Sequence, residues 1–200
     1  MKLDHIAIVA STLEAGVSWV EQALGVPLQP GGQHALFGTH NMLLSLGPDV
    51  YLEVIAVDPA ATPPGRARWF DLDRFTGTPR IGNWIVNTED ISSDVARLGE
   101  QIGRTVLLAR ADLRWTMAVP DSGVLPFDNI HPALIEWGGR HPAPTLIDQG
   151  VRLRALHVSH PQAQGLQALI DLGDDCVVYE TGAPGLRAVF DTPSGRCTLG

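Results

Sequence analysis

The sequence has few cysteines, few basic residues and no long apolar segment. Its two cysteines, Cys176 and Cys197, are too few for a disulfide framework and lack the CxxC spacing of zinc ribbons and redox centres. Only 14 Lys and Arg stand against 22 Asp and Glu, so the formal charge is -8 and no basic footprint exists for nucleic acid or an anionic membrane. No stretch approaches the roughly 20 apolar residues of a membrane span, and no apolar signal segment opens the chain. We therefore expect a cytoplasmic protein.

A nucleotide-binding loop is also missing. The pair Gly31-Gly32 fits neither the GxxxxGK[ST] nor the GxGxxG pattern. What the chain does have is 44% apolar and 18% charged residues over 200 positions, which is enough to bury a large core.

A strand followed by a capped helix opens the sequence. Residues 3–9 are short, apolar and β-branched, and Ser11-Thr12-Leu13-Glu14 has the spacing of a capping box. One apolar stripe follows at helical spacing, and Gly25 stands where a left-handed helix end belongs. The stripe consists of Leu13, Val17, Val20 and Leu24.

The same unit returns twice. A strand at 81–86 precedes a helical stripe that ends before Gly103, and a strand at 152–158 precedes a third stripe that ends before Gly173. The second stripe consists of Ile91, Val95, Leu98 and Ile102, and the third of Leu166, Leu169 and Ile170. Repetition in sequence indicates repetition in architecture.

Further strand candidates give each unit the order β-α-β-β-β. They are Met42–Leu46, Tyr51–Val57, Leu113–Val119, Ala133–Trp137, Cys176–Tyr179 and Leu186–Phe190. We expect one α+β domain over residues 1–200, with module one at 1–59, a connection at 60–79, module two at 80–141 and a truncated third module at 150–200.

Tandem βαβββ units that open with Leu3-Asp4-His5-Ile6 and close the first copy with Tyr51–Ile55 resemble the vicinal-oxygen-chelate superfamily of glyoxalase, bleomycin-resistance and dioxygenase proteins. Three further strings, Gly31–His34, Gly38–Asn41 and Leu134–Trp137, look like its glyoxalase-like domain family of mostly uncharacterised bacterial proteins. The likeness covers nearly the whole chain. It implies a curled mixed sheet that forms an open cup around a small molecule.

The resemblance also implies a divalent metal at the base of the cup, with His5 and Glu53 at two ligand positions. These ligand types suit Zn, Ni, Mn, Co or Fe without choosing among them. The second unit departs from the pattern, because Asn83 stands where its histidine belongs. Glu136 is the expected counterpart of Glu53 and serves as a third ligand or as the catalytic base. We expect His34, His40 or His131 to replace the missing histidine, or else the site to be metal-free.

Each candidate also has a structural interpretation. His5 is equally a hydrogen-bonded core histidine, His34 and His40 are either substrate-binding or turn-capping residues, and Asn41 either contacts substrate or forms a turn. Glu53 and Glu136 have alternative arginine partners, which are Arg66, Arg68 and Arg80 for the first and Arg114 and Arg140 for the second. The tryptophans Trp69, Trp84, Trp115 and Trp137 are expected mainly in the core.

Three functions fit these expectations. The first is a metal-dependent lyase or isomerase that acts on a small oxygenated metabolite by chelating two vicinal oxygens. The second is a non-catalytic binding or sequestration protein, which the substitution at Asn83 favours. The third is a ring-cleaving dioxygenase, which needs Fe(II), two histidines and one carboxylate. The substrate, monomer against homodimer, and the purpose of the third unit stay open.

Overall fold

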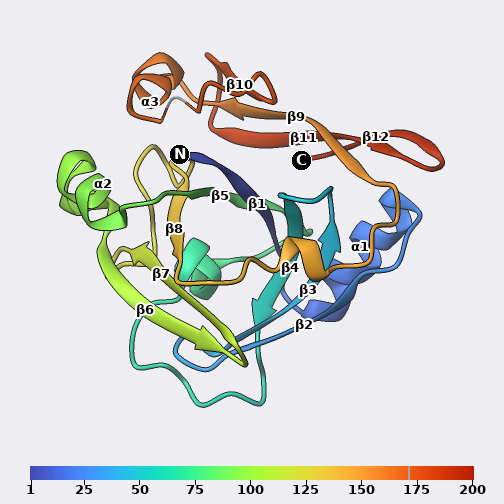
Figure 1. The fold of residues 1–200 in the computed structure, drawn as a ribbon, viewed down its shortest axis with the longest axis horizontal. Helices are drawn as coiled ribbons and strands as arrows, with labels where there is room; N and C mark the ends of the chain where they lie inside the picture. The colour runs from blue at the N-terminus through green and yellow to red at the C-terminus, as the bar shows by residue number, and fades with distance from the viewer. Residues whose placement is uncertain (171) are drawn as a thin grey trace.

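The molecule is built around two β-sheets (Figure 1). The structure is a computed structural model that describes residues 1–170 and 172–200. The larger sheet has the spatial order β2-β3-β4-β1-β5-β8-β7-β6. Its strands are β1 (Lys2–Val9), β2 (Gln29–His34), β3 (Thr39–Ser45), β4 (Tyr51–Val57), β5 (Arg80–Asn87), β6 (Arg104–Arg110), β7 (Leu113–Val119) and β8 (Ala133–Trp137). The smaller sheet has the order β10-β9-β11-β12, from β9 (Arg152–Ser159), β10 (Val177–Glu180), β11 (Gly185–Thr192) and β12 (Gly195–Leu199).

Helices cover the strands at the expected places. They are α1 (Leu13–Leu24), α2 (Ile91–Leu98) and α3 (Ala163–Leu169), with short 3-10 segments η1 (Trp69–Arg74), η2 (Glu100–Ile102) and η3 (Ala143–Thr145). The start of α1 is capped by Thr12, whose hydroxyl accepts a hydrogen bond from the Ala15 N–H, and the helix ends at Gly25 with φ 72°. None of the described helices has the length and apolar character needed to span a bilayer.

The first two units join through β1 and β5, which pair antiparallel at the centre of the larger sheet. Within each unit the first and last strands pair in parallel, so that Ala7 lies opposite Glu53 and Ile85 lies opposite Ala133. The sheet curls until its two edges approach each other, with Gly32 of β2 beside Arg110 of β6. The α+β cup predicted from the sequence is confirmed.

Two details differ from the sequence-based expectation. The strands β2, β6 and β12 were not predicted, and Gly31, Gly32 and His34 therefore lie on a strand and not in a loop. The helix expected from Ile91 to Ile102 ends at Leu98, because Gly99 takes φ 92° and leaves only a 3-10 turn beyond it.

The third unit is neither truncated nor a topological copy of the first two. It has the full element order β9-α3-β10-β11-β12, but β9 pairs in parallel with β10, the strand that directly follows the helix. In unit one, β1 instead pairs in parallel with β4, the last strand. The smaller sheet therefore packs beside the cup and does not extend it (Figure 1).

Candidate functional site

The concave side of the larger sheet forms an open pocket with about 410 Å³ of empty space, adjoining solvent included. Strands from both units line it, together with η1 from the connection between them. The polar lining residues are His5, His34, Asn41, Tyr51, Glu53 and Arg110, and the apolar ones are Leu43, Trp69, Phe70, Trp115, Met117, Ile135 and Trp137. An apolar concavity with a few convergent polar groups is the usual form of a small-molecule site.

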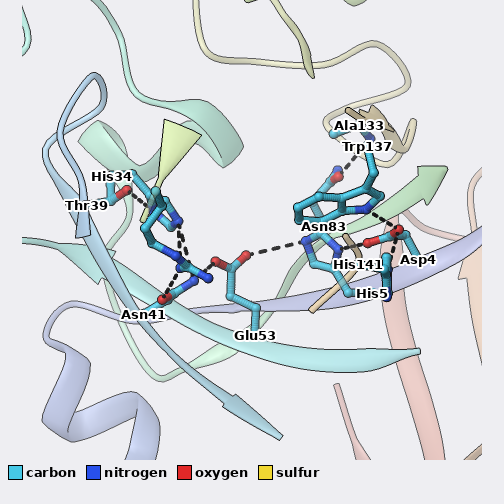
Figure 2. A network of polar contacts seen from close by, with 11 residues as sticks. Asp4, His5, His34, Thr39, Asn41, Glu53, Asn83, Ala133, Trp137 and His141 are labelled. Carbon is cyan, nitrogen blue, oxygen red and sulfur yellow. Dashed lines mark hydrogen bonds and ion pairs between the residues drawn. The ribbon is translucent and has the colours of Figure 1, made fainter. Parts of the chain in front are cut away.

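A row of three ionisable side chains forms the base of the cup (Figure 2). His5 Nδ1 lies 2.6 Å from Asp4 Oδ1, and His5 Nε2 lies 3.6 Å from Glu53 Oε2. A register irregularity in β1 between Leu3 and His5 accompanies the contact between the neighbours Asp4 and His5. The His5 ring also stacks on Tyr51 with centroids 4.4 Å apart, so the imidazole is held on its edge and on its face.

The two carboxylates and the imidazole determine each other's charge. Burial alone would lower the pKa of His5, but Asp4 and Glu53 outweigh it and raise that pKa to about 9. Burial would likewise raise the pKa of Glu53, yet the contact with His5 and the amide of Asn41 lower it to about 2. The pKa of Asp4 also lies well below its ordinary value, because hydrogen bonds from His141 and His5 outweigh the cost of burial. Near neutral pH the row is carboxylate, imidazolium, carboxylate.

Asp4 connects this row to the rest of the molecule. Its side chain is 1% exposed, and its second oxygen, Oδ2, accepts hydrogen bonds from Trp137 Nε1 at 2.9 Å, His141 Nε2 at 3.0 Å and Asn87 Nδ2 at 3.2 Å. Those donors come from β8, the segment after it, and β5. Asp4 thus couples the position of His5 to the second unit.

A second polar cluster lies on the other side of Glu53. Asn41 Nδ2 donates to Glu53 Oε1 at 2.6 Å, and Asn41 Oδ1 accepts from Arg110 Nη1 at 3.0 Å and from the Gly32 N–H at 2.7 Å. Arg110 Nη1 also lies 3.4 Å from His34 Nε2, while His34 Nδ1 lies 3.0 Å from Thr39 Oγ1. Burial is the main reason that the pKa of His34 falls to about 4, so this ring is neutral.

Four of the predicted site residues therefore meet in the cup. They are His5, Glu53, His34 and Asn41. His40 does not join them, because it alternates with Asn41 along β3 and so faces the opposite side of the sheet from the cup. The expectation that His40 reaches the cup is corrected by this alternation.

Glu136 also lies outside the cup. Its Oε2 accepts a hydrogen bond of 2.8 Å from the N–H of Ile91, the first residue of α2. The pairing of Ile85 with Ala133 makes Ala133 the counterpart of Glu53, and Ile135 and Trp137 are the β8 residues that line the cup. Glu136 lies three positions beyond Ala133, and an odd shift along a strand moves a side chain to the other face of the sheet.

The side chains of Asn83 and His131 form polar contacts with the backbone around the start of β8. Asn83 Nδ2 donates to the His131 carbonyl at 3.0 Å, and its Oδ1 accepts from the Ala133 N–H at 3.0 Å. His131 Nδ1 contacts the Pro132 carbonyl at 2.7 Å, and its ring is not among those that line the cavity. Of the three histidines proposed to replace the one missing at position 83, only His34 reaches the cup.

Sequence reasoning missed three polar residues of the site, Asp4, Tyr51 and Arg110, and underestimated the tryptophans. Asp4 was visible as an acid inside an apolar strand next to His5, a signal equal to the one used for Glu53. Arg110 had no signal, because nothing local shows that β6 meets β2. Of the tryptophans, Trp84 is fully buried, whereas Trp69, Trp115 and Trp137 line the cup.

The donor set does not fit a divalent ion held by the protein alone. The first unit offers His5 Nε2 and Glu53 Oε2, but the facing strands of the second unit present Trp115, Met117 and Ile135. No group of three or more His, Cys, Asp or Glu suited to a metal occurs among residues 1–170 and 172–200. Protein-bound zinc has three or four protein ligands, so two donors leave an ion dependent on oxygens from a bound molecule.

Comparison with known proteins places this geometry among related folds. Residues 3–171 match a family model described as a glyoxalase-like domain. A hypothetical protein from Staphylococcus aureus has 15% identity, with 92% of this chain and 88% of that chain covered and a TM-score of 0.63. Methylmalonyl-CoA epimerase from Mycobacterium tuberculosis has 19% identity, with 68% and 86% covered and a TM-score of 0.43. The Streptomyces coelicolor epimerase in complex with 2-nitronate-propionyl-CoA has 16% identity, with 70% and 99% covered and a TM-score of 0.45. No curated protein matches the chain.

Proposed function

This chain belongs to the glyoxalase-like domain family, and from that premise we propose that its cup binds a small oxygenated metabolite on which Glu53 moves a proton, as in a lyase or an isomerase. Fold membership alone does not select a reaction, since one scaffold carries many. The residues that line the cup are what distinguish one reaction from another.

The proposal rests on one observation: a buried proton donor, His5, and a buried proton acceptor, Glu53, face each other at the bottom of the cup. Glu53 is 5% exposed and ionised, His5 is protonated, and 3.6 Å separates Oε2 from Nε2. In the proposed reaction Glu53 takes a proton from the carbon beside a substrate carbonyl while His5 gives its Nε2 proton to the carbonyl oxygen. The enol that results is reprotonated at carbon, or it loses a leaving group from the next carbon. Proton transfer by placed side chains contributes typically about 10²–10⁴ in rate.

The positions of both groups are fixed before a substrate arrives. Asp4 holds Nδ1 of His5 at 2.6 Å, so the Nε2 edge points at Glu53, and Asn41 holds the other oxygen of Glu53 at 2.6 Å. Such preorganisation removes a cost that the reaction would otherwise carry.

No step of the proposed reaction involves a metal ion, because the protein offers such an ion only two donors, His5 and Glu53. A ring-cleaving dioxygenase would need two histidines and one carboxylate on Fe(II). His34 is the second histidine in the cup, but its Nε2 faces Arg110 and Asn41, at 3.4 and 3.5 Å. We therefore do not propose dioxygenase chemistry.

A second candidate function is ligand binding without catalysis. It is supported by the apolar wall that stands opposite His5 and Glu53, where Trp115, Met117 and Ile135 take the place of a second set of polar residues. A wall of this kind holds an apolar molecule but adds no reactive group.

Hydrogen exchange at carbon separates the two candidates. The protein is incubated in D₂O with pyruvate, methylglyoxal, its glutathione hemithioacetal and dihydroxyacetone, and loss of the C–H signal is followed by NMR with and without a chelator. We expect enzyme-dependent exchange on at least one compound, and a loss of about a hundredfold or more in Glu53→Gln because the base is removed.

Glu136→Gln is the matched control, since it makes the same change on the other face of the sheet. It should exchange at the rate of the unchanged protein. Binding of a compound without any exchange would support the non-catalytic candidate, and equal loss in both variants would contradict the role of Glu53.

A further inference from the structure

We infer that Arg110 forms a subsite for an oxyanion, so that the molecule bound in the cup carries a carboxylate or a phosphate group. The inference rests on the proposed function in one respect, which is that the cup is where the small molecule binds. It goes further by stating what chemical group that molecule has and which residue recognises it.

Arg110 reaches the cup from the opposite edge of the sheet. It is the last residue of β6 in the second unit, yet its guanidinium contacts Asn41 and His34 of the first. It is half-buried and lines the cavity. Its side chain thus closes the seam between the two edges of the curled sheet.

Within residues 1–170 and 172–200 the Arg110 guanidinium forms no ion pair, and only its Nη1 has a hydrogen-bond partner. The Glu53 carboxylate is linked to it only through the side-chain amide of Asn41. Both partners are uncharged, namely the side-chain amide oxygen Oδ1 of Asn41 and the neutral imidazole of His34. Nε and Nη2 are left to donate to something else.

A cation in that position favours an anion as its partner. Partial burial of a charge is costly unless it is paired, and guanidinium matches the two oxygens of a carboxylate or phosphate with two parallel hydrogen bonds. The other charges of the cup do not meet this need, because Glu53 is already engaged by His5 and Asn41.

The glycine pair of β2 makes room for this arrangement. A Cβ on Gly32 would lie 2.7 Å from Arg110 Cδ, and a Cβ on Gly31 would lie 2.0 Å from Asn41 Oδ1. Neither glycine has the positive φ that would require glycine for backbone reasons. Their lack of side chains is what lets Asn41 and Arg110 lie across the strand, which gives the Gly31-Gly32 motif a role unrelated to phosphate loops.

The other residues that line the cup determine the shape and polarity of the rest of the ligand. Trp69 and Trp115 lie near the guanidinium end of the cavity, because each makes an edge contact with the ring of His34, which lies 3.4 Å from Arg110 Nη1. A molecule that fits is small, with an oxyanion at one end and an apolar or planar body.

The test uses benzoate, phenyl phosphate and the uncharged benzyl alcohol as probes. Binding to the full chain is followed by quenching of tryptophan fluorescence and by chemical shifts in NMR titrations up to 50 mM of each probe. We expect one or both anions to bind at least about tenfold more tightly than the alcohol, and Arg110→Gln to remove that preference, a loss of about tenfold to a hundredfold. The better of the two anions identifies the oxyanion.

Two further variants sharpen the result. Arg104→Gln removes the same charge from the other end of β6, where Arg104 pairs with Asp121, and should bind the anions as the unchanged protein does. Gly32→Ala keeps the charge of Arg110 but displaces its side chain, and should weaken anion binding without affecting benzyl alcohol.

The inference is overturned if no anion binds, if the alcohol binds as tightly as the anions, or if Arg110→Gln and Arg104→Gln have equal effects. Failure of the proposed reaction has a different signature. Glu53→Gln then exchanges hydrogen as the unchanged protein does, or no exchange occurs at all, while anion binding still depends on Arg110.

Discussion

At the scale of single residues, the cup depends on a side chain that does not face its centre. Asp4 accepts hydrogen bonds from His5, Trp137, His141 and Asn87, which come from three separate stretches of chain. A buried carboxylate satisfied in this way is costly to disturb, because each donor left without a partner remains buried. Asp4 is therefore a positioning residue for His5.

Asp4→Asn should destabilise the fold and loosen the orientation of His5. The amide keeps the shape of the carboxylate but loses its charge and one acceptor, so we expect the free energy of unfolding to fall by about 3 kcal/mol or more. Urea unfolding measures this. Asp112→Asn is the control, since Asp112 forms an exposed ion pair with Arg140 and should change stability little. Equal losses in the two variants would contradict the role given to Asp4.

The sequence could predict those site residues whose type is unusual for their surroundings. His5 and Glu53 stood out as polar residues in apolar strands, and His34 and Asn41 as polar residues close to glycine. The sequence could not predict Arg110, because its contact with Asn41 spans the seam of the sheet. It also misplaced Glu136, since facing in a strand depends on register to a single residue.

At the scale of elements, the strands that sequence missed share one property. β2 and β6 are the two edges of the larger sheet, and β12 is an edge of the smaller one. Edge strands have one neighbour and more solvent contact, so they lack the continuous apolar pattern on which strand prediction depends. Central strands such as β4 and β7 were predicted with the bounds that the structure has.

Helix α2 provides a test at this scale. Because Glu136 accepts a hydrogen bond from the Ile91 N–H at the start of the helix, Glu136→Ala should lower the free energy of unfolding by about 0.5–2 kcal/mol. Glu89→Ala removes an exposed acid next to the same helix end and should cost less. Chemical unfolding of both variants makes the comparison. A loss of proton transfer in Glu136→Ala at unchanged stability would restore Glu136 as a catalytic residue.

At the scale of the whole molecule, buried histidines couple stability to pH in opposite directions. The pKa of His5 is raised to about 9, mainly because its neighbouring carboxylates outweigh burial, so the folded chain holds a proton there that the unfolded chain releases above about pH 6.5. Burial lowers the pKa of His34 and of His131 to about 4, so at these two positions the unfolded chain takes up protons first as the pH falls.

These signs predict a maximum in the free energy of unfolding near pH 6.5. The stabilisation from His5 is complete below that pH and is lost as the pH rises toward 9, whereas the stability associated with His34 and His131 is lost as the pH falls toward 4. Each histidine contributes up to about 3 kcal/mol over its limb. Urea unfolding from pH 4.5 to 9 in the presence of a chelator measures the curve. His131→Gln should flatten the acid limb alone and His5→Gln the alkaline limb alone, because the two rings lie in separate parts of the fold. An unchanged acid limb in His131→Gln would show that this ring has the same pKa in the folded and unfolded chains, against the lowered value given for it.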